Sequence, residues 1–114
     1  MNGIERIAAE RKRQIEAEGW TPEHDDTHSK GELNAAAVAY ATANLDRSMG
    51  GEDAAFSSFF PSNWLVSWWK PSADPIRNLE KAGALIAAEI DRLQRHRASP
   101  ENTGGRHGEC SIRL

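Results

Sequence analysis

The chain has a single cysteine, no long apolar run and no excess of basic residues, and each absence excludes a class of protein. One cysteine, Cys110, among 114 residues allows neither a disulfide framework nor the CxxC spacing of a zinc site. No apolar run approaches the ~20 residues of a membrane span, and the first residues lack the apolar segment of a signal peptide. A net charge of −3 argues against general nucleic-acid binding, which needs a basic face. We therefore expect a cytoplasmic protein without membrane or general nucleic-acid partners.

What the chain does contain is enough for one small helical domain. Apolar residues recur at three- and four-residue steps over 4–18, from about 30 to 45, and over 75–97, as in amphipathic helices. The last residues have no apolar period and are rich in glycine and polar side chains. We predict an all-α fold over 1–97, a compact bundle of three main helices with short extra turns, followed by a disordered tail over 98–114.

Local signals predict where the helices begin and end. Gly19 suits the end of the first helix, and Thr21–Pro22 suits the start of a short helical turn. The pattern Ser29–Glu32 fits a capping box, so the second helix should begin near residue 30. Asp74–Pro75 predicts the start of the third helix. Between them the signal is weakest over 46–58, where we predict a turn or mobile loop at 49–53, and we expect a short helix over 62–69.

The third helix carries a regular apolar seam that predicts its packing. A repeat of 3.5 residues suits packing against a nearly antiparallel helix. Glycine in a helix interior costs about 1 kcal/mol, so Gly83 on this seam indicates a close crossing. We predict that it crosses the alanine face of the second helix, and either surface could also bury against a second copy of the chain. The seam consists of Ile76, Leu79, Gly83, Ile86, Ile90 and Leu93.

The segment between the first two helices concentrates histidines and carboxylates. These side chains are ligands for divalent metals, and His28 and Glu32 share a face if both are helical. One interpretation is a divalent-metal site, with Glu89 or Asp91 completing it. The other is a structural or ligand-binding loop, because Asp and His beside helix starts commonly bind backbone N–H groups. The candidate metal ligands are His24, Asp25, Asp26, His28 and Glu32.

A second segment, 59–71, holds three of the four tryptophans and ends in a lysine. Tryptophan faces stack on flat rings, and a nearby cation can hold phosphate. Trp64, Trp68, Trp69 and Lys70, with Arg77 and Lys81 on the first turns of the following helix, would suit a purine nucleotide. The alternative is that these tryptophans close a small core.

The residues also resemble known groups of proteins. The run Glu18-Gly-Trp-Thr-Pro-Glu-His-Asp-Asp-Thr-His28 and the run Trp68-Trp-Lys-Pro71 resemble small uncharacterised proteins frequent in bacteriophages and prophages. Residues 81–93 match the same group, and the likeness covers about residues 5 to 95. It implies a phage or prophage origin, and hence a bacterial host cytoplasm, but no activity.

A second resemblance is to the repeat domain of ryanodine receptors. Those domains place a helix before a Gly-Trp-Thr turn, followed by an acidic residue, a histidine and a leucine. The matching residues are Gly19, Trp20, Thr21, Asp26, His28 and Leu33. The chain departs from that pattern because it has no His-Pro or Leu-x-Pro-Tyr step. The resemblance implies a helical binding module that accepts an adenine nucleotide.

Three functions follow from these features. The first is a small binding protein for a nucleotide or nucleotide-derived signal, with a regulatory or counter-defence role and no assigned cofactor. A tryptophan wall would stack on the base, carboxylates would bind ribose or base, and cations would meet phosphate. The expected ligand-binding residues are Trp20, Asp25, Asp26, His28, Trp64, Trp68, Trp69, Lys70 and Arg77.

The second function is a metal-dependent nucleotide pyrophosphohydrolase resembling the MazG type. Such enzymes hold metal with ExxE and ExxD carboxylate pairs on adjacent helices. The candidate carboxylates Glu16, Glu18, Glu32, Glu89 and Asp91 have neither spacing, which favours a binding protein over an enzyme. The third function is a protein–protein inhibitor of a host enzyme. A closed pocket lined by the tryptophans would favour the first function, and a large exposed aromatic patch the third.

Overall fold

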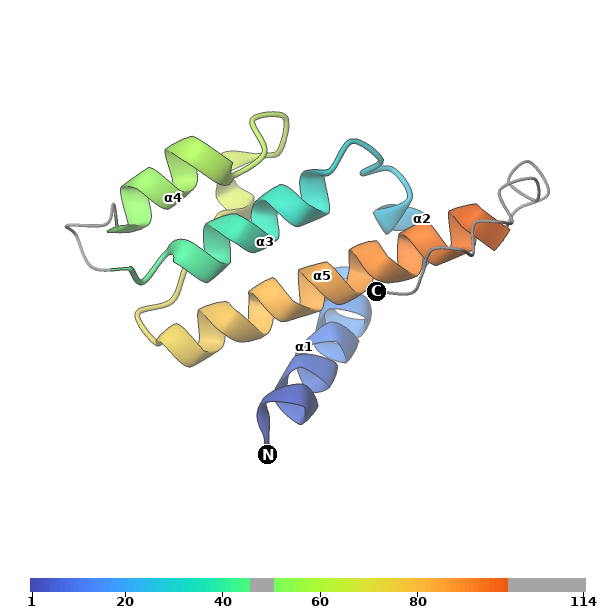
Figure 1. The fold of residues 1–114 in the computed structure, drawn as a ribbon, viewed down its shortest axis with the longest axis horizontal. Coiled ribbons are helices and arrows are strands. Elements are labelled where there is room, and N and C mark those ends of the chain that lie inside the picture. Colours follow the sequence, from blue (N-terminus) through green and yellow to red (C-terminus); the bar gives the residue numbers. More distant parts are fainter. Residues whose placement is uncertain (46–50, 99–114) are drawn as a thin grey trace, which may run out of the picture.

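The structure, a computed structural model, describes residues 1–45 and 51–98 and has an all-α fold (Figure 1). The expected fold class is confirmed, and no described residue lies in a strand. Of the tail expected over 98–114, only Ala98 is described, as the last residue of a helix, and the rest lies outside the described residues. The elements are α1 (Gly3–Glu18), α2 (Pro22–Asp25), α3 (Glu32–Thr42), α4 (Gly51–Phe59), the 3-10 turn η2 (Val66–Trp68) and α5 (Pro75–Ala98).

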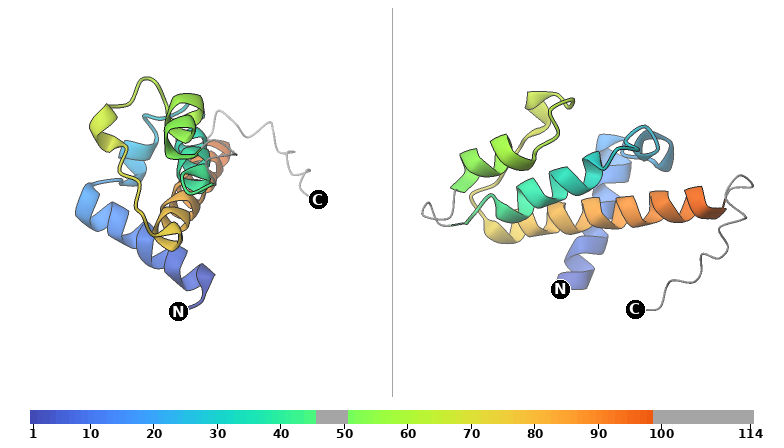
Figure 2. Two further views of the ribbon diagram at one scale, coloured as in Figure 1. Left: turned by 90° about the vertical axis from the view of Figure 1, so that its left-hand side faces the viewer. Right: turned by 45° about the horizontal axis from the view of Figure 1, so that its top comes forward.

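The long helix α5 organises the molecule. The helix α3 packs along it, α1 crosses it steeply from another side, and α2 contacts its C-terminal half (Figures 1 and 2). The helix α4 packs on α3, away from α5. Among the described residues, no helix combines the length and the apolar character needed to cross a membrane.

The core lies between α3 and α5 and is built largely of small side chains. Leu33 and Tyr40 from α3 and Leu85 from α5 are its larger aliphatic and phenolic members, and buried alanines fill the space around them. Small residues let the two helices approach closely. An aromatic layer covers one side of this core: Phe60 and Trp64 are buried, and Trp20, Phe56, Trp68 and Trp69 pack against it.

Three of the predicted helix ends are present with their caps. Gly19 ends α1 in the left-handed conformation, with φ of 76°. The Thr21 hydroxyl accepts a hydrogen bond from the His24 N–H at the start of α2. At the start of α5, Asp74 Oδ1 accepts from the Ile76 N–H at 3.0 Å. Each cap satisfies a backbone group that the helix leaves unpaired.

The start of α3 differs from the prediction. Gly31 precedes the helix, with φ of 87°, and makes no side-chain cap, so the capping box expected from Ser29 does not form. The Glu32 carboxylate accepts instead from the Lys30 N–H at 2.7 Å and from the Asn63 amide at 3.1 Å. The tertiary contact with Asn63 therefore competes with the local cap.

The chain between α3 and α5 also differs from the prediction. A helix, α4, occupies 51–59, where no helix was expected, and η2 replaces the helix expected over 62–69. The turn expected at 49–53 lies partly outside the described residues, and 51–53 form the first turn of α4. Glu52 and Asp53 in that first turn favour the positive helix end, and Phe56 and Phe60 stack at 5.5 Å. Contact with the core thus supports a helix whose own apolar pattern is weak.

The helix predicted to pack against Gly83 is wrong: α1, and not α3, crosses α5 at this residue. A Cβ atom at Gly83 would lie 2.5 Å from Ile7 Cδ1, so the glycine admits α1 and not α3. The side of α5 that packs in the core with α3 is a neighbouring stripe that includes the buried Ala82, Leu85 and Ala88. Four of the other five seam residues face outward, because Ile76, Leu79, Ile86 and Ile90 are 49 to 54% exposed, and only Leu93 is partly buried.

Candidate functional site

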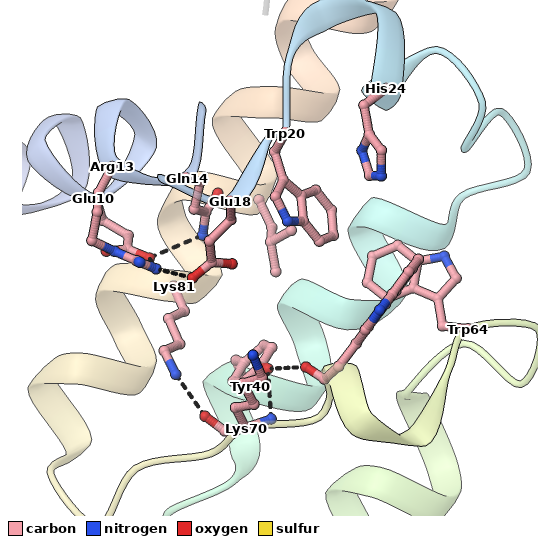
Figure 3. A pocket seen from close by; sticks show the side chains of 12 residues that line it. Glu10, Arg13, Gln14, Glu18, Trp20, His24, Tyr40, Trp64, Lys70 and Lys81 are labelled. Atoms are coloured by element: carbon pink, nitrogen blue, oxygen red, sulfur yellow. Dashed lines mark hydrogen bonds and ion pairs between the residues drawn. The ribbon is translucent and has the colours of Figure 1, made fainter. Parts of the chain in front are cut away.

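A pocket of about 370 Å³ opens between α1, the tryptophan-bearing segment 59–71 and α5 (Figure 3). This volume is at the lower end of the range typical of small-molecule sites. Its walls come from segments far apart in the sequence. The lining residues are Glu10, Arg13, Gln14, Glu18, Trp20, His24, Tyr40, Trp64, Trp68, Lys70, Lys81 and Leu85.

The α1 side of the pocket is charged, and its charges alternate in sign. Residues three, four and eight positions apart on a helix share a face, which places Glu10, Arg13, Gln14 and Glu18 on one side of α1. They join residues of α5 in a continuous series of ion pairs, here called the ion-pair ladder. Its five contacts measure 3.1, 3.1, 2.5, 2.8 and 2.6 Å along the order Arg6, Glu80, Arg77, Glu10, Arg13 and Glu18.

Glu10 is the centre of the ion-pair ladder. Its side chain is buried, both oxygens accept from the Arg13 guanidinium at 2.8 Å, and Gln14 adds a hydrogen bond at 3.2 Å. Burial alone would raise the pKa of Glu10, but the hydrogen bonds and charges of Arg13 and Arg77 outweigh it and lower the pKa to about 2. Glu10 is therefore a fixed anion whose charge is already neutralised.

Three tryptophans form an aromatic corner on the other side of the pocket. The ring centroids of Trp20 and Trp64 are 5.3 Å apart, those of Trp64 and Trp68 5.2 Å, and those of Trp20 and Trp68 6.0 Å, all edge to face. His24 extends this wall, 4.8 Å from Trp20. Trp64 is buried, while Trp20 and Trp68 are partly exposed. The partly exposed indoles of Trp20 and Trp68 therefore offer an aromatic surface on which a flat ring can pack.

Hydrogen bonds from a tyrosine of α3 and a lysine of α5 hold the backbone of the segment that carries Trp68. The Tyr40 hydroxyl donates to the Trp68 carbonyl and accepts from the Lys70 N–H, both at 3.0 Å. Lys81 Nζ donates to the Lys70 carbonyl at 2.6 Å and lies 5.4 Å from the Tyr40 ring centre (Figure 3). Burial lowers the pKa of Lys81, and the neighbouring Arg77 lowers it further.

Four of the nine predicted ligand-binding residues line the pocket: Trp20, Trp64, Trp68 and Lys70. The Trp20 segment and the Trp64–Lys70 segment thus lie side by side. The sequence did not show which of Trp68 and Trp69 lines the pocket. Trp69 packs against the core, with its ring centroid 4.8 Å from that of Tyr40 and 5.3 Å from that of Phe60.

The other four predicted residues do not line the pocket. Asp25 is fully buried and pairs with Arg11 at 2.9 Å, and burial raises the pKa of its carboxyl. Asp26 pairs with Arg95 on the surface at 2.7 Å. His28 is buried behind Trp64, at 4.9 Å, where burial and His24 lower the pKa of its imidazole. Arg77 is held by Glu10 and Glu80.

The sequence reasoning missed the α1 wall, whereas Lys81, expected among the cations beside the tryptophans, does line the pocket. The available signal was the spacing of Glu10, Arg13, Gln14 and Glu18 on one helix face, but solvated charges on a surface helix have the same spacing. Tyr40 packs in the core, while its hydroxyl donates a hydrogen bond to the Trp68 carbonyl in the pocket segment.

The structure does not assemble the predicted metal ligands. Within residues 1–45 and 51–98, no three His, Cys, Asp or Glu side chains are grouped so that they could hold a metal ion. Asp25, Asp26 and Glu32 bind Arg11, Arg95 and Asn63, respectively. These carboxylates are engaged by the protein itself.

Comparisons with protein-family models, with curated proteins and with solved structures find no match for the chain. The geometry of the pocket therefore carries the functional argument.

Proposed function

We propose that the protein binds a flat, negatively charged small molecule, a nucleotide or a nucleotide-derived signal, in this pocket. The observation that carries the proposal is the aromatic corner of Trp20, Trp64 and Trp68 next to Lys70 and Lys81. Indole faces stack on any base at about 1–3 kcal/mol per base, and ammonium groups attract phosphate. Both requirements of a nucleotide meet in one pocket.

The charge of the pocket favours an anion over a cation. An aromatic corner with carboxylates would also suit a cationic ligand, but both carboxylates of this pocket are occupied. Glu10 is bound by Arg13 and Arg77, and Glu18 by Arg13. The lysines are not neutralised in this way, so a cation would meet net positive charge.

The ion pairs of the pocket and the burial of its tryptophans weigh against the two alternatives, a metal-dependent hydrolase and a protein–protein inhibitor. A metal-dependent hydrolase needs free carboxylates facing the ligand, and those of the pocket are bound by arginines. An inhibitor that uses an aromatic surface needs exposed tryptophans, whereas Trp64 is 7% exposed and Trp69 packs in the core. With the phage-type resemblance, the proposed role is to sequester a host defence signal or to regulate phage nucleotide use in the host cytoplasm.

We expect Trp68→Ala to weaken nucleotide binding by about tenfold or more, because one stacking surface is lost. The measurement is isothermal titration of the purified protein with purine mono-, di- and cyclic nucleotides. Leu65→Ala is the matched control, since Leu65 precedes the same 3-10 turn, is 62% exposed and does not line the pocket. Absence of binding by the unmodified protein to every nucleotide of the panel would refute the proposed function.

A further inference from the structure

We propose that the ligand ends in one phosphomonoester group, held by Lys70 and Lys81. This inference rests on the proposed function and specifies the class of nucleotide. The charged side chains around the pocket fall into two groups, those that form ion pairs with one another and the two lysines that do not, and the lysines indicate the charge of the ligand.

The ion-pair ladder is electrically complete. Its three guanidinium groups and three carboxylates alternate, and every inner member contacts an opposite charge on both sides. Glu10, at its centre, stays ionised at any physiological pH because its pKa is about 2. The ladder as a whole therefore carries no net charge, and the carboxylates of its members in the pocket wall, Glu10 and Glu18, are both bound by Arg13.

Lys70 and Lys81 are the positively charged residues of the pocket that form no ion pair within the described chain. Both line the pocket, and neither ammonium group forms an ion pair with a carboxylate of the described residues. The only hydrogen bond of Lys81 Nζ among those residues goes to the Lys70 carbonyl, a neutral acceptor. Lys81 is also half-buried, which makes an uncompensated charge there costly. Two ammonium groups thus lie beside the aromatic corner without an ion-pair contact among the described residues.

A phosphomonoester has the charge that two ammonium groups can neutralise. It carries about −1.5 to −2 charges at neutral pH and presents three acceptor oxygens, enough for two ammonium groups. A cyclic phosphodiester carries a single charge and leaves one lysine unpaired, and a nucleoside leaves both. A di- or triphosphate brings more charge than the two lysines neutralise.

The experiment compares four ligand forms for each of the common bases by isothermal titration of the full-length chain. The forms are the nucleoside, its 5′-monophosphate, its 3′,5′-cyclic monophosphate and its 5′-triphosphate. We expect the 5′-monophosphate of at least one base to bind about tenfold or more tighter than its nucleoside and its cyclic ester, because a hydrogen bond to a charged group is worth about 1.5–3 kcal/mol. The triphosphate should bind more weakly than the monophosphate.

Lysine variants assign the phosphate to its position. Lys70→Gln and Lys81→Gln should each weaken monophosphate binding about threefold or more, while nucleoside affinity stays within about twofold. Lys12→Gln is the matched control, because Lys12 is exposed on α1 and does not line the pocket. Near-ultraviolet circular dichroism checks that the Lys81 variant, which loses a contact to the 68–70 segment, retains its tryptophan packing.

The outcomes separate this inference from the proposed function. A cyclic ester or triphosphate that binds as tightly as the monophosphate would overturn the inference and leave nucleotide binding intact. The same holds if both lysine variants bind monophosphate like the unmodified protein. If no form of any base binds, the proposed function fails and the inference fails with it.

Discussion

Glu10→Gln should lower the free energy of unfolding by about 3 kcal/mol, the largest effect we expect from a single polar substitution in this chain. Glu10 is 3% exposed and connects Arg13 and Arg77. Removing one partner of a buried ion pair costs about 3–5 kcal/mol, because the remaining charges stay buried without compensation. Urea unfolding at pH 7 measures the loss.

The effect of Glu10→Gln should depend on pH in a defined direction. The pKa of Glu10 is about 2 in the folded protein and near 4.5 in the unfolded chain. The carboxylate therefore stabilises the fold fully above pH 4.5, and this stabilisation is lost as the pH falls toward 2. We expect the difference in unfolding free energy between the two proteins to be constant from pH 7 to pH 5.5 and to narrow between pH 4.5 and pH 3.

Glu16→Gln is the control for this substitution. Glu16 lies on the same helix, is exposed, and forms no hydrogen bond or ion pair among the described residues, so its replacement should change stability by no more than about 0.5 kcal/mol. Equal stabilities of the Glu10 and Glu16 variants at pH 7 would contradict the central place of Glu10 in the ion-pair ladder.

Gly83→Leu should destabilise the protein by about 2 kcal/mol, despite the gain in helix propensity. Leucine favours a helix over glycine by somewhat under 1 kcal/mol, but a Cβ at this position already lies 2.5 Å from Ile7 Cδ1 and 3.2 Å from Ile7 Cγ2. A longer side chain forces α1 away from α5, and such overpacking costs about 1–3 kcal/mol or more. Thermal and urea unfolding report this change.

A double-mutant cycle with Ile7→Ala identifies the contact responsible. If Ile7 is the obstacle, the double variant should be more stable than the sum of the two single effects predicts, by about 1 kcal/mol. Additive effects would show that the crowding at Gly83 comes from elsewhere. Because α1 carries four of the six members of the ion-pair ladder, Gly83→Leu should also weaken nucleotide binding if the proposed function holds.

The resemblance to phage proteins and to the ryanodine receptor repeat stays an expectation. Its Gly-Trp-Thr turn has a clear structural role in this chain: Gly19 ends α1, Thr21 begins α2, and Trp20 between them enters the aromatic corner. Asp26 and His28, which belong to the same likeness, hold Arg95 and support Trp64 instead of lining the pocket. The turn positions one wall of the site, whatever the origin of the chain.

The amino-acid sequence by itself determined the helical class and most helix ends. Gly19, Thr21 and Asp74 act through bonds to backbone groups within a few residues, so their effect is readable without knowing the fold. The sequence also indicated that two irregular, chemically rich segments hold the tryptophans of the site. Local stereochemistry and side-chain type were sufficient for these predictions.

Only the tertiary structure decided which faces meet and which charges are free. The Arg77–Glu10 contact joins residues 67 positions apart, and the contact of Gly83 with Ile7 is comparably distant. Trp68 and Trp69 are neighbours of the same type, yet one lines the pocket and the other the core. Asp25 and Asp26 are likewise adjacent, and one is buried on Arg11 while the other lies on the surface. Helix periodicity limits which side chains can share a face, but the angle at which α1 crosses α5 selects their partners, and long-range packing sets that angle.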